Sequence, residues 1–392
     1  MSAAAAPGPA IGISYGERAA APALAPRRLP ELDGLRGVAV LLVIVCHYVA
    51  NVMPRRDTAV LRSTLGWTWS GVDLFFVLSG FLIGGILLAR RDSPRYYHTF
   101  YLRRACRILP AYVVVVAAAF AFSALAERGL LPAVPARRLL PPWTYLTFTQ
   151  NLFMAAREGF GSQLLSPTWS LAIEEQFYLL APLAVRLIAP RRVPLVLVAG
   201  ILAAPALRLS LGVRDDGTAP LAAYVLMPAR ADALLLGVLA AWAWQQESVH
   251  RVLREAGAWL LLPAVPCAAA VAVLALRGGG NPLTPEMARG GFSWLALGYT
   301  LVVLAAAGQA RALRPLVWPP LQALGRVSYA TYLLHLPILR ILHFALLRDF
   351  PSVTGAGAAV TLLAFLVTVG LAAVSWRFFE GPIVSWGHRA SY

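Results

Sequence analysis

Long apolar segments dominate this sequence and restrict its fold more than any other feature. Several of them reach 18 residues or more, the length that an α-helix needs to cross about 30 Å of hydrocarbon. Hydrophobic residues make up 59% of the 392-residue chain and charged residues only 13%, too few to cover the surface of a soluble protein. The sequence therefore predicts an all-α, polytopic transmembrane helical bundle.

Hydropathy predicts about ten spans and no internal repeat. We place the spans at residues 33–52, 70–89, 109–126, 171–189, 193–212, 222–244, 256–276, 291–308, 326–347 and 355–378. The stretch 127–170 is too weakly apolar to be a span, and we expect it to form an external re-entrant or interfacial segment. The predicted domains are a disordered cytoplasmic tail (1–29), one membrane domain (30–382) and a short cytoplasmic tail (383–392).

All the basic residues are arginines, and the formal net charge is +16. The loop 90–108 is rich in arginine, and the bias toward positive cytoplasmic loops places both termini in the cytoplasm of a bacterial inner membrane. A GC-rich genome explains the absence of lysine, and binding of anionic lipids or phosphates is the functional alternative. Membrane lipids are expected partners. Nucleic acid is not, because no soluble domain exists to carry a basic face.

The first predicted span contains two ionisable residues, Arg36 and His47. Eleven residues correspond to about 1100°, or three turns plus about 20°, so both side chains lie on one helix face about 16 Å apart. Arg36 could simply extend toward the headgroups, and His47 could be a buried neutral histidine bonded to a neighbouring helix. The shared face favours a functional role for both.

Two adjacent acids, Glu174 and Glu175, follow Ser170 near the external end of a later span. Helix capping, with Ser170 as the N-cap, explains one carboxylate. It explains the second less well, because neighbouring residues point about 100° apart and one must face inward. An inward glutamate close to His47 could hold the imidazole in one tautomer.

Other polar residues form weaker patterns. Three arginines follow the second span: Arg103, Arg104 and Arg107. They could simply keep this loop on the cytoplasmic side of the membrane. Alternatively, Arg104 and Arg107, at i and i+3 of a helix, could converge on one anion. Further candidates are Asp73, Tyr329 and His335, an Arg230–Asp232 ion pair, and close helix packing at Gly80 and Gly84. The three cysteines show no pairing pattern, and no group of residues has metal-ligand spacing.

Six segments in order resemble the acyltransferase 3 family of bacterial membrane O-acyltransferases. They are residues 32–47, 71–83, 101–110, 169–178, 328–337 and 379–382. The resemblance implies that His47 is catalytic. It also implies that Arg104 with Arg107, and Glu174 with Glu175, are functional motifs of the family.

The resemblance implies transfer of an acyl group, expected to be acetyl, from cytoplasmic acyl-CoA to a hydroxyl of a sugar-containing acceptor such as a cell-surface polysaccharide, with no metal. In this interpretation His47 is the general base or an acyl carrier, and Glu174 or Glu175 orients it. Arginines bind the phosphates, and polar residues support the substrate. The arginines expected to bind the phosphates are Arg36, Arg103, Arg104 and Arg107. The polar residues expected to support the substrate are Asp73, Ser170, Tyr329 and His335. The alternatives are acylation of a small glycoside such as a macrolide, and a non-catalytic proton-coupled transporter.

Overall fold

The computed structural model describes residues 29–53, 59–131 and 139–392, and every regular element in these ranges is helical. The expected N-terminal tail, residues 1–28, lies outside the described part. Ten helices have 16 residues or more. They are α1 (Pro30–Val45), α3 (Gly71–Ala89), α4 (Tyr96–Glu127), α7 (Thr168–Leu187), α8 (Val193–Ser210), α10 (Met227–Trp244), α12 (Leu261–Arg277), α13 (Phe292–Ala307), α15 (Ser328–Leu347) and α16 (Gly355–Ser375).

These ten helices correspond one to one to the predicted spans and confirm a polytopic helical bundle. In the described ranges, eight helices are long and apolar enough to cross a membrane by length and composition, and the number is nine if the bent pair 247–255 and 258–274 is counted as one span. The tenth predicted span is α7, a helix of 20 residues that contains both Glu174 and Glu175. The protein is therefore a multi-pass membrane protein.

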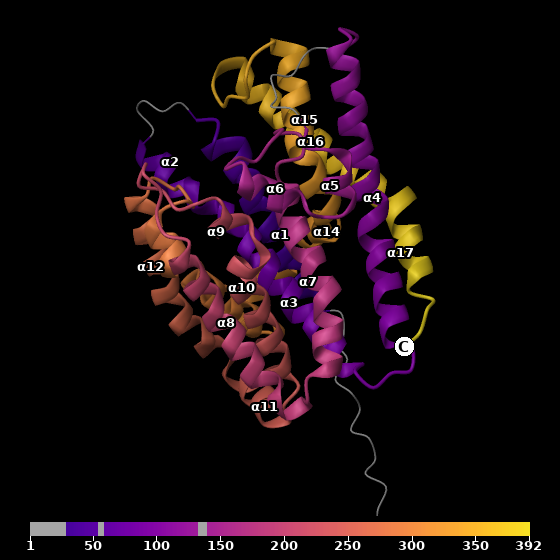
Figure 1. The fold of residues 1–392 in the computed structure, drawn as a ribbon, viewed down its shortest axis with the longest axis vertical. Helices are drawn as coiled ribbons and strands as arrows, with labels where there is room; N and C mark the ends of the chain where they lie inside the picture. Colours follow the sequence, from indigo (N-terminus) through magenta and orange to yellow (C-terminus); the bar gives the residue numbers. More distant parts are fainter. Residues whose placement is uncertain (1–28, 54–58, 132–138) are drawn as a thin grey trace, which may run out of the picture.

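Helix α3 lies in the middle of the bundle and packs against α1, α7, α10 and α13, while α4 runs along one side and α8 and α12 lie on the other (Figure 1). Its closest neighbour is α10, where Gly80 faces Gly237. A Cβ at Gly80 would collide with the carbonyl group of Leu234, and a Cβ at Gly84 would lie 3.0 Å from Val238. These contacts confirm the predicted close packing at both glycines.

Buried ion pairs join α3, α8 and α10. Arg230 pairs with Asp73 of α3, and Arg208 of α8 pairs with Asp232 at 2.8 Å. All four side chains are almost completely buried. The expected Arg230–Asp232 pair is therefore wrong: residues two apart on a helix do not face each other, so each of the two binds a partner on another helix.

The segment 127–170 contains two short helices, α5 (Pro142–Leu146) and α6 (Gln150–Ala156), neither of which could span a membrane. Gln150 and Asn151 are completely buried. Gln150 donates to the carbonyl group of Thr168 at 2.9 Å, and Asn151 donates to that of Val225 at 3.0 Å. Side-chain amides thus satisfy backbone carbonyls where this segment meets the starts of α7 and α10.

The end of the chain packs against α4 (Figure 1). Helix α16 continues through a π-helical turn, η7 (Trp376–Glu380), into α17 (Gly381–Gly387). A Cβ at Gly387 would lie 2.9 Å from the Cβ of Cys106 on α4, so the two helices approach closely. The last residues are therefore held against the bundle, where the sequence predicted only a short tail.

Candidate active site

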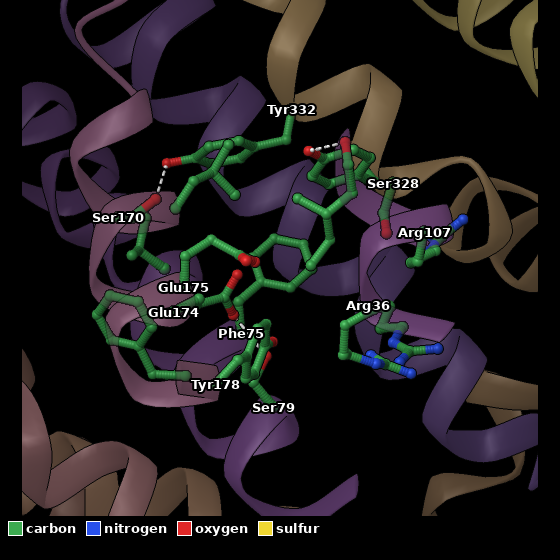
Figure 2. Close-up of a pocket in the computed structure, with 16 residues that line it drawn as sticks. Arg36, Phe75, Ser79, Arg107, Ser170, Glu174, Glu175, Tyr178, Ser328 and Tyr332 are labelled. Atoms are coloured by element: carbon green, nitrogen blue, oxygen red, sulfur yellow. Dashed lines mark hydrogen bonds between the residues drawn. The ribbon is translucent and has the colours of Figure 1, made fainter. Parts of the chain in front are cut away.

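Two adjoining cavities contain most of the polar residues that the sequence singled out. The smaller, which we call the arginine cavity, has a volume of 100 Å³ and is lined from α1, α3, α4, α7 and α15. It brings together Arg36, Arg104, Arg107, Ser170, Glu174, Glu175 and Tyr329. Figure 2 shows Arg36 and Arg107 on one side of it and the two glutamates on the other.

The three arginines of this cavity come from two helices and reach one space, as the spacing of Arg104 and Arg107 predicted. The Arg107 guanidinium lies over the ring of Tyr329, 5.8 Å from its centroid, and over the ring of Trp376, 5.0 Å from its centroid. Its Nη1 atom is buried and has no hydrogen-bond partner among the described residues. Stacking fixes the plane of a guanidinium and leaves its N–H groups free for an anion.

Arg103 differs from its neighbours because it does not line the arginine cavity. Its Nε and Nη2 atoms donate to the carbonyl group of Ala390 at 3.2 and 2.7 Å, and its guanidinium lies 5.1 Å from the ring of Tyr392. In this structure Arg103 fastens the C-terminal residues to α4. The sequence could not reveal this partner, because it lies 287 residues away.

Glu174 and Glu175 do not contact His47. Glu174 accepts a hydrogen bond from Ser79 of α3, and both acids line the arginine cavity. The expected hydrogen bond from the imidazole to a glutamate is absent, because Glu174 lies six residues into α7, about 9 Å below its start. The expected capping role of Ser170 is absent too: α7 begins at Thr168 without a side-chain cap.

His47 borders the second cavity, which we call the histidine cavity, with a volume of 1140 Å³. The residue lies in a π-helical turn, η1 (Cys46–Ala50), which continues α1. Its Nδ1 atom is 3.1 Å from the carbonyl oxygen of Val43 and 3.3 Å from Nε2 of His335. The ring therefore contacts a second histidine where the sequence led us to expect a carboxylate.

These contacts assign the tautomers of both neutral rings. The Nδ1 atom of His335 is 2.6 Å from the carbonyl oxygen of Tyr332, an acceptor only, so Nδ1 of His335 must donate. Nε2 of His335 is then an acceptor and can bond only to a protonated Nδ1 of His47. His47 consequently carries its proton on Nδ1, and its Nε2 keeps a free lone pair. A histidine in this state can act as a general base.

Tyr332 separates the two cavities and lines both of them, as does Val72. Its hydroxyl group donates to the carbonyl group of Pro167 at 3.0 Å and lies 2.6 Å from the Ser170 hydroxyl oxygen. Figure 2 shows this last contact as a dashed line at the edge of the arginine cavity. Arg36 and His47 thus border adjoining cavities, with one tyrosine between them.

The remaining predicted support residues have other contacts. The Tyr329 hydroxyl donates to the carbonyl group of Ile108 at 2.9 Å. Asp73 forms an ion pair with Arg230, and it lines neither cavity. Sequence reasoning overlooked Arg340, which lines the histidine cavity five residues after His335. Its charge within a span was the available signal. The described residues contain no group of three or more His, Cys, Asp or Glu that could hold a metal.

Comparison with known proteins agrees with the sequence motifs. The family profile described as an acyltransferase domain matches residues 29–377. An O-acetyltransferase of Staphylococcus aureus is 28% identical over 385 residues, which cover 93% of this chain and 58% of the relative. A peptidoglycan O-acetyltransferase of Listeria monocytogenes is 27% identical over 377 residues, which cover 91% and 56%. No solved structure matches the chain significantly.

The chain thus spans somewhat more than half the length of the curated relatives that it matches. The family profile, in contrast, extends from the start of α1 to the π-helical turn η7 after α16, and it includes the residues that line both cavities. This match extends over most of the chain, and it includes the segments that carry Arg36, His47, Arg104 and Glu174. The chain belongs to the acyltransferase 3 family.

Proposed function

We propose that this protein is a membrane O-acyltransferase that moves an acyl group, expected to be acetyl, from acyl-CoA to a hydroxyl of a sugar-containing acceptor such as peptidoglycan. One observation carries the proposal: a cavity with three arginines adjoins a cavity with an unprotonated histidine nitrogen. A donor that is anionic at one end and reactive at the other suits such a pair. The relatives named as O-acetyltransferases support the same reaction class.

In this proposal the donor lies across both cavities. Arg36, Arg104 and Arg107 bind the CoA phosphates by charge-assisted hydrogen bonds. The pantetheine chain passes Tyr332, which must give up its bond to Ser170 or turn aside, and the thioester reaches the histidine cavity. Glu174 and Glu175 face the arginines across the cavity and would hold the guanidinium groups in position while no acyl-CoA is bound.

The chemical step in this proposal depends on the tautomer of His47, which leaves Nε2 free to accept a proton. Nε2 of His47 takes the proton of the acceptor hydroxyl, and the oxygen attacks the thioester carbon. The carbon–sulfur bond breaks, the ester forms, and the imidazolium returns the proton to the CoA thiolate. His335 remains neutral and accepts the Nδ1–H of His47 throughout, so it stabilises the imidazolium as the proton arrives.

Acceptor-dependent release of CoA tests the proposal. Purified protein receives acetyl-CoA and a disaccharide of the peptidoglycan repeat, and free thiol and acetylated sugar are measured together. We expect equal amounts of both products from the native protein. Since loss of a general base slows a reaction by about 10²–10⁴, we expect neither product above background from His47→Ala. A protein that transports without chemistry would release no CoA, and an active His47→Ala variant would remove this residue from the mechanism.

The proposed placement in a bacterial inner membrane, with both termini and the arginine cavity on the cytoplasmic side, needs a separate test. Gln163 lines the histidine cavity and is exposed. With Cys46 replaced by serine, Gln163→Cys should react with a membrane-impermeant maleimide in intact cells. Asp92→Cys, in the loop after α3, should react only after the cells are opened. The opposite pattern would favour an acceptor on the cytoplasmic side, such as a small glycoside.

A further inference from the structure

Among the residues that the structure describes, the histidine cavity is lined by one cation that has no acidic partner. Its charged lining residues, apart from His47, are Glu158 and Arg340. Glu158 is occupied: it pairs with Arg214 at 2.7 Å and accepts the backbone N–H of Leu221 at 2.9 Å. Arg340 forms no ion pair with any acid in the part of the chain that the structure describes, so its charge faces the cavity uncompensated.

The position of Arg340 makes this unusual. It lies in the interior of α15, eight residues before the exposed Arg348 at the helix end. The residue is partly buried, and its Nε atom is buried without a hydrogen-bond partner among the described residues. A guanidinium within a span with an unsatisfied N–H group is costly unless an anion binds it. The fold thus maintains a cation in the space that His47 borders.

The other walls of the histidine cavity suit a carbohydrate. Trp69, Trp169 and Tyr224 line it, and the rings of Trp169 and Tyr224 are 4.5 Å apart. Asn51 and Gln163 add amide groups. Aromatic faces with a few amide and hydroxyl groups bind sugar rings, and a single charged residue then selects among sugars by the charge that they carry.

We propose, on the basis of the proposed function, that the acceptor carries an acidic group, a carboxylate or a phosphate, close to the hydroxyl that receives the acyl group, and that Arg340 binds it. Arg340 would bind such a group bidentately and fix the sugar, so that one hydroxyl reaches Nε2 of His47. Arg340 is then a specificity-determining residue. The same guanidinium chemistry would fit a lipid headgroup phosphate, which the experiment below separates from the acceptor.

The test compares two matched glycans in detergent without phosphate. One is a disaccharide that contains N-acetylmuramic acid, whose lactyl group ends in a carboxylate, and the other is the same disaccharide with that carboxylate converted to a methyl amide. Equilibrium binding is measured calorimetrically and needs no turnover. A hydrogen-bonded charge pair discriminates by about tenfold or more. We therefore expect the native protein to bind the acid at least about tenfold more tightly than the amide.

The variants locate this preference. Arg340→Gln should bring the Kd of the acid to that of the amide, and Arg340→Lys should keep part of the difference because it retains the charge but not the planar fork. Arg348→Gln makes the same charge change on the same helix outside the cavity and should keep the full preference. Repeating the measurement with the glycan bearing a 1-phosphate and no carboxylate distinguishes the two acidic groups.

Three results would overturn the inference: binding of the carboxylate glycan and the 1-phosphate glycan no more tightly than the neutral amide, binding of none of the three, or a preference for the acidic glycan that survives Arg340→Gln. A lipid role is tested in parallel by adding phosphatidylglycerol. If it raises the Tm of the native protein and Arg348→Gln but not that of Arg340→Gln, and acid and amide bind equally, Arg340 serves a lipid and the acceptor assignment fails. Acid-selective binding without acyl transfer would instead refute the proposed function and leave Arg340 as an anion site.

Discussion

Replacing His335 separates the proposed mechanism from a merely structural role for the histidine pair. His335→Ala removes the acceptor for the Nδ1–H of His47, but the carbonyl oxygen of Val43 remains at 3.1 Å and still favours the same tautomer. The ground state then loses a hydrogen bond between neutral groups, worth ~0.5–1.5 kcal/mol, and the transition state loses one to the imidazolium, worth ~1.5–3 kcal/mol, so the barrier rises by roughly 1 kcal/mol. At ~1.36 kcal/mol per factor of ten, kcat should fall about twofold to tenfold. Loss of His47 itself should cost about 10²–10⁴.

The assay follows acetyl-CoA consumption with a saturating glycan acceptor, at several acetyl-CoA concentrations. The KM for acetyl-CoA should stay unchanged, because the arginines that bind the donor line the other cavity. His335→Gln should recover most of the activity, since its amide oxygen can accept the Nδ1–H of His47. An unchanged kcat in His335→Ala, or a loss as large as that of His47→Ala, would refute the proposed role of His335 as the acceptor that supports His47. So would failure of the glutamine variant to do better than alanine despite equal expression.

Three further predictions concern donor binding and stability. Arg107→Gln should raise the KM for acetyl-CoA by about tenfold or more. Arg103→Gln should leave this KM unchanged and lower the Tm, because Arg103 binds Ala390 and Tyr392. Equal changes of KM in the two variants would contradict this prediction. Asp73→Ala should destabilise the protein by ~3–5 kcal/mol by leaving Arg230 buried and unpaired, and unfolding in detergent at the native midpoint would contradict it. Gly80→Ala should cost ~1–3 kcal/mol through collision with the Leu234 carbonyl, while Gly85→Ala, with its Cβ 3.7 Å from Ala241, should unfold at the native temperature.

The sequence predicted the helices well because hydropathy and length follow directly from the membrane. All ten predicted spans have a corresponding helix, and the small-residue contact at Gly80 follows from the same reasoning. Convergence of Arg104 and Arg107 was predictable too, since residues three apart on one helix share a face. These features depend on local sequence alone.

The polar partners on neighbouring helices were not predictable, because spacing along one helix does not give the depth or rotation of its neighbours. Glu174 lies too far along α7 to reach His47, and it meets the arginine cavity instead. His335 occupies that place, although the sequence marked it only as an intramembrane residue in need of a partner. Asp232 likewise pairs with Arg208, a residue that no motif had singled out. In each case a residue far away in the sequence decides the contact.

The structure of His47→Ala with acetyl-CoA, determined by electron cryomicroscopy, tests the central claim most directly. The variant should hold the donor without consuming it. The proposal predicts CoA phosphates within hydrogen-bond distance of Arg36, Arg104 or Arg107, a pantetheine chain beside Tyr332, and the acetyl group in the histidine cavity. A nucleotide bound in the histidine cavity, or a thioester that ends short of Tyr332, would contradict it.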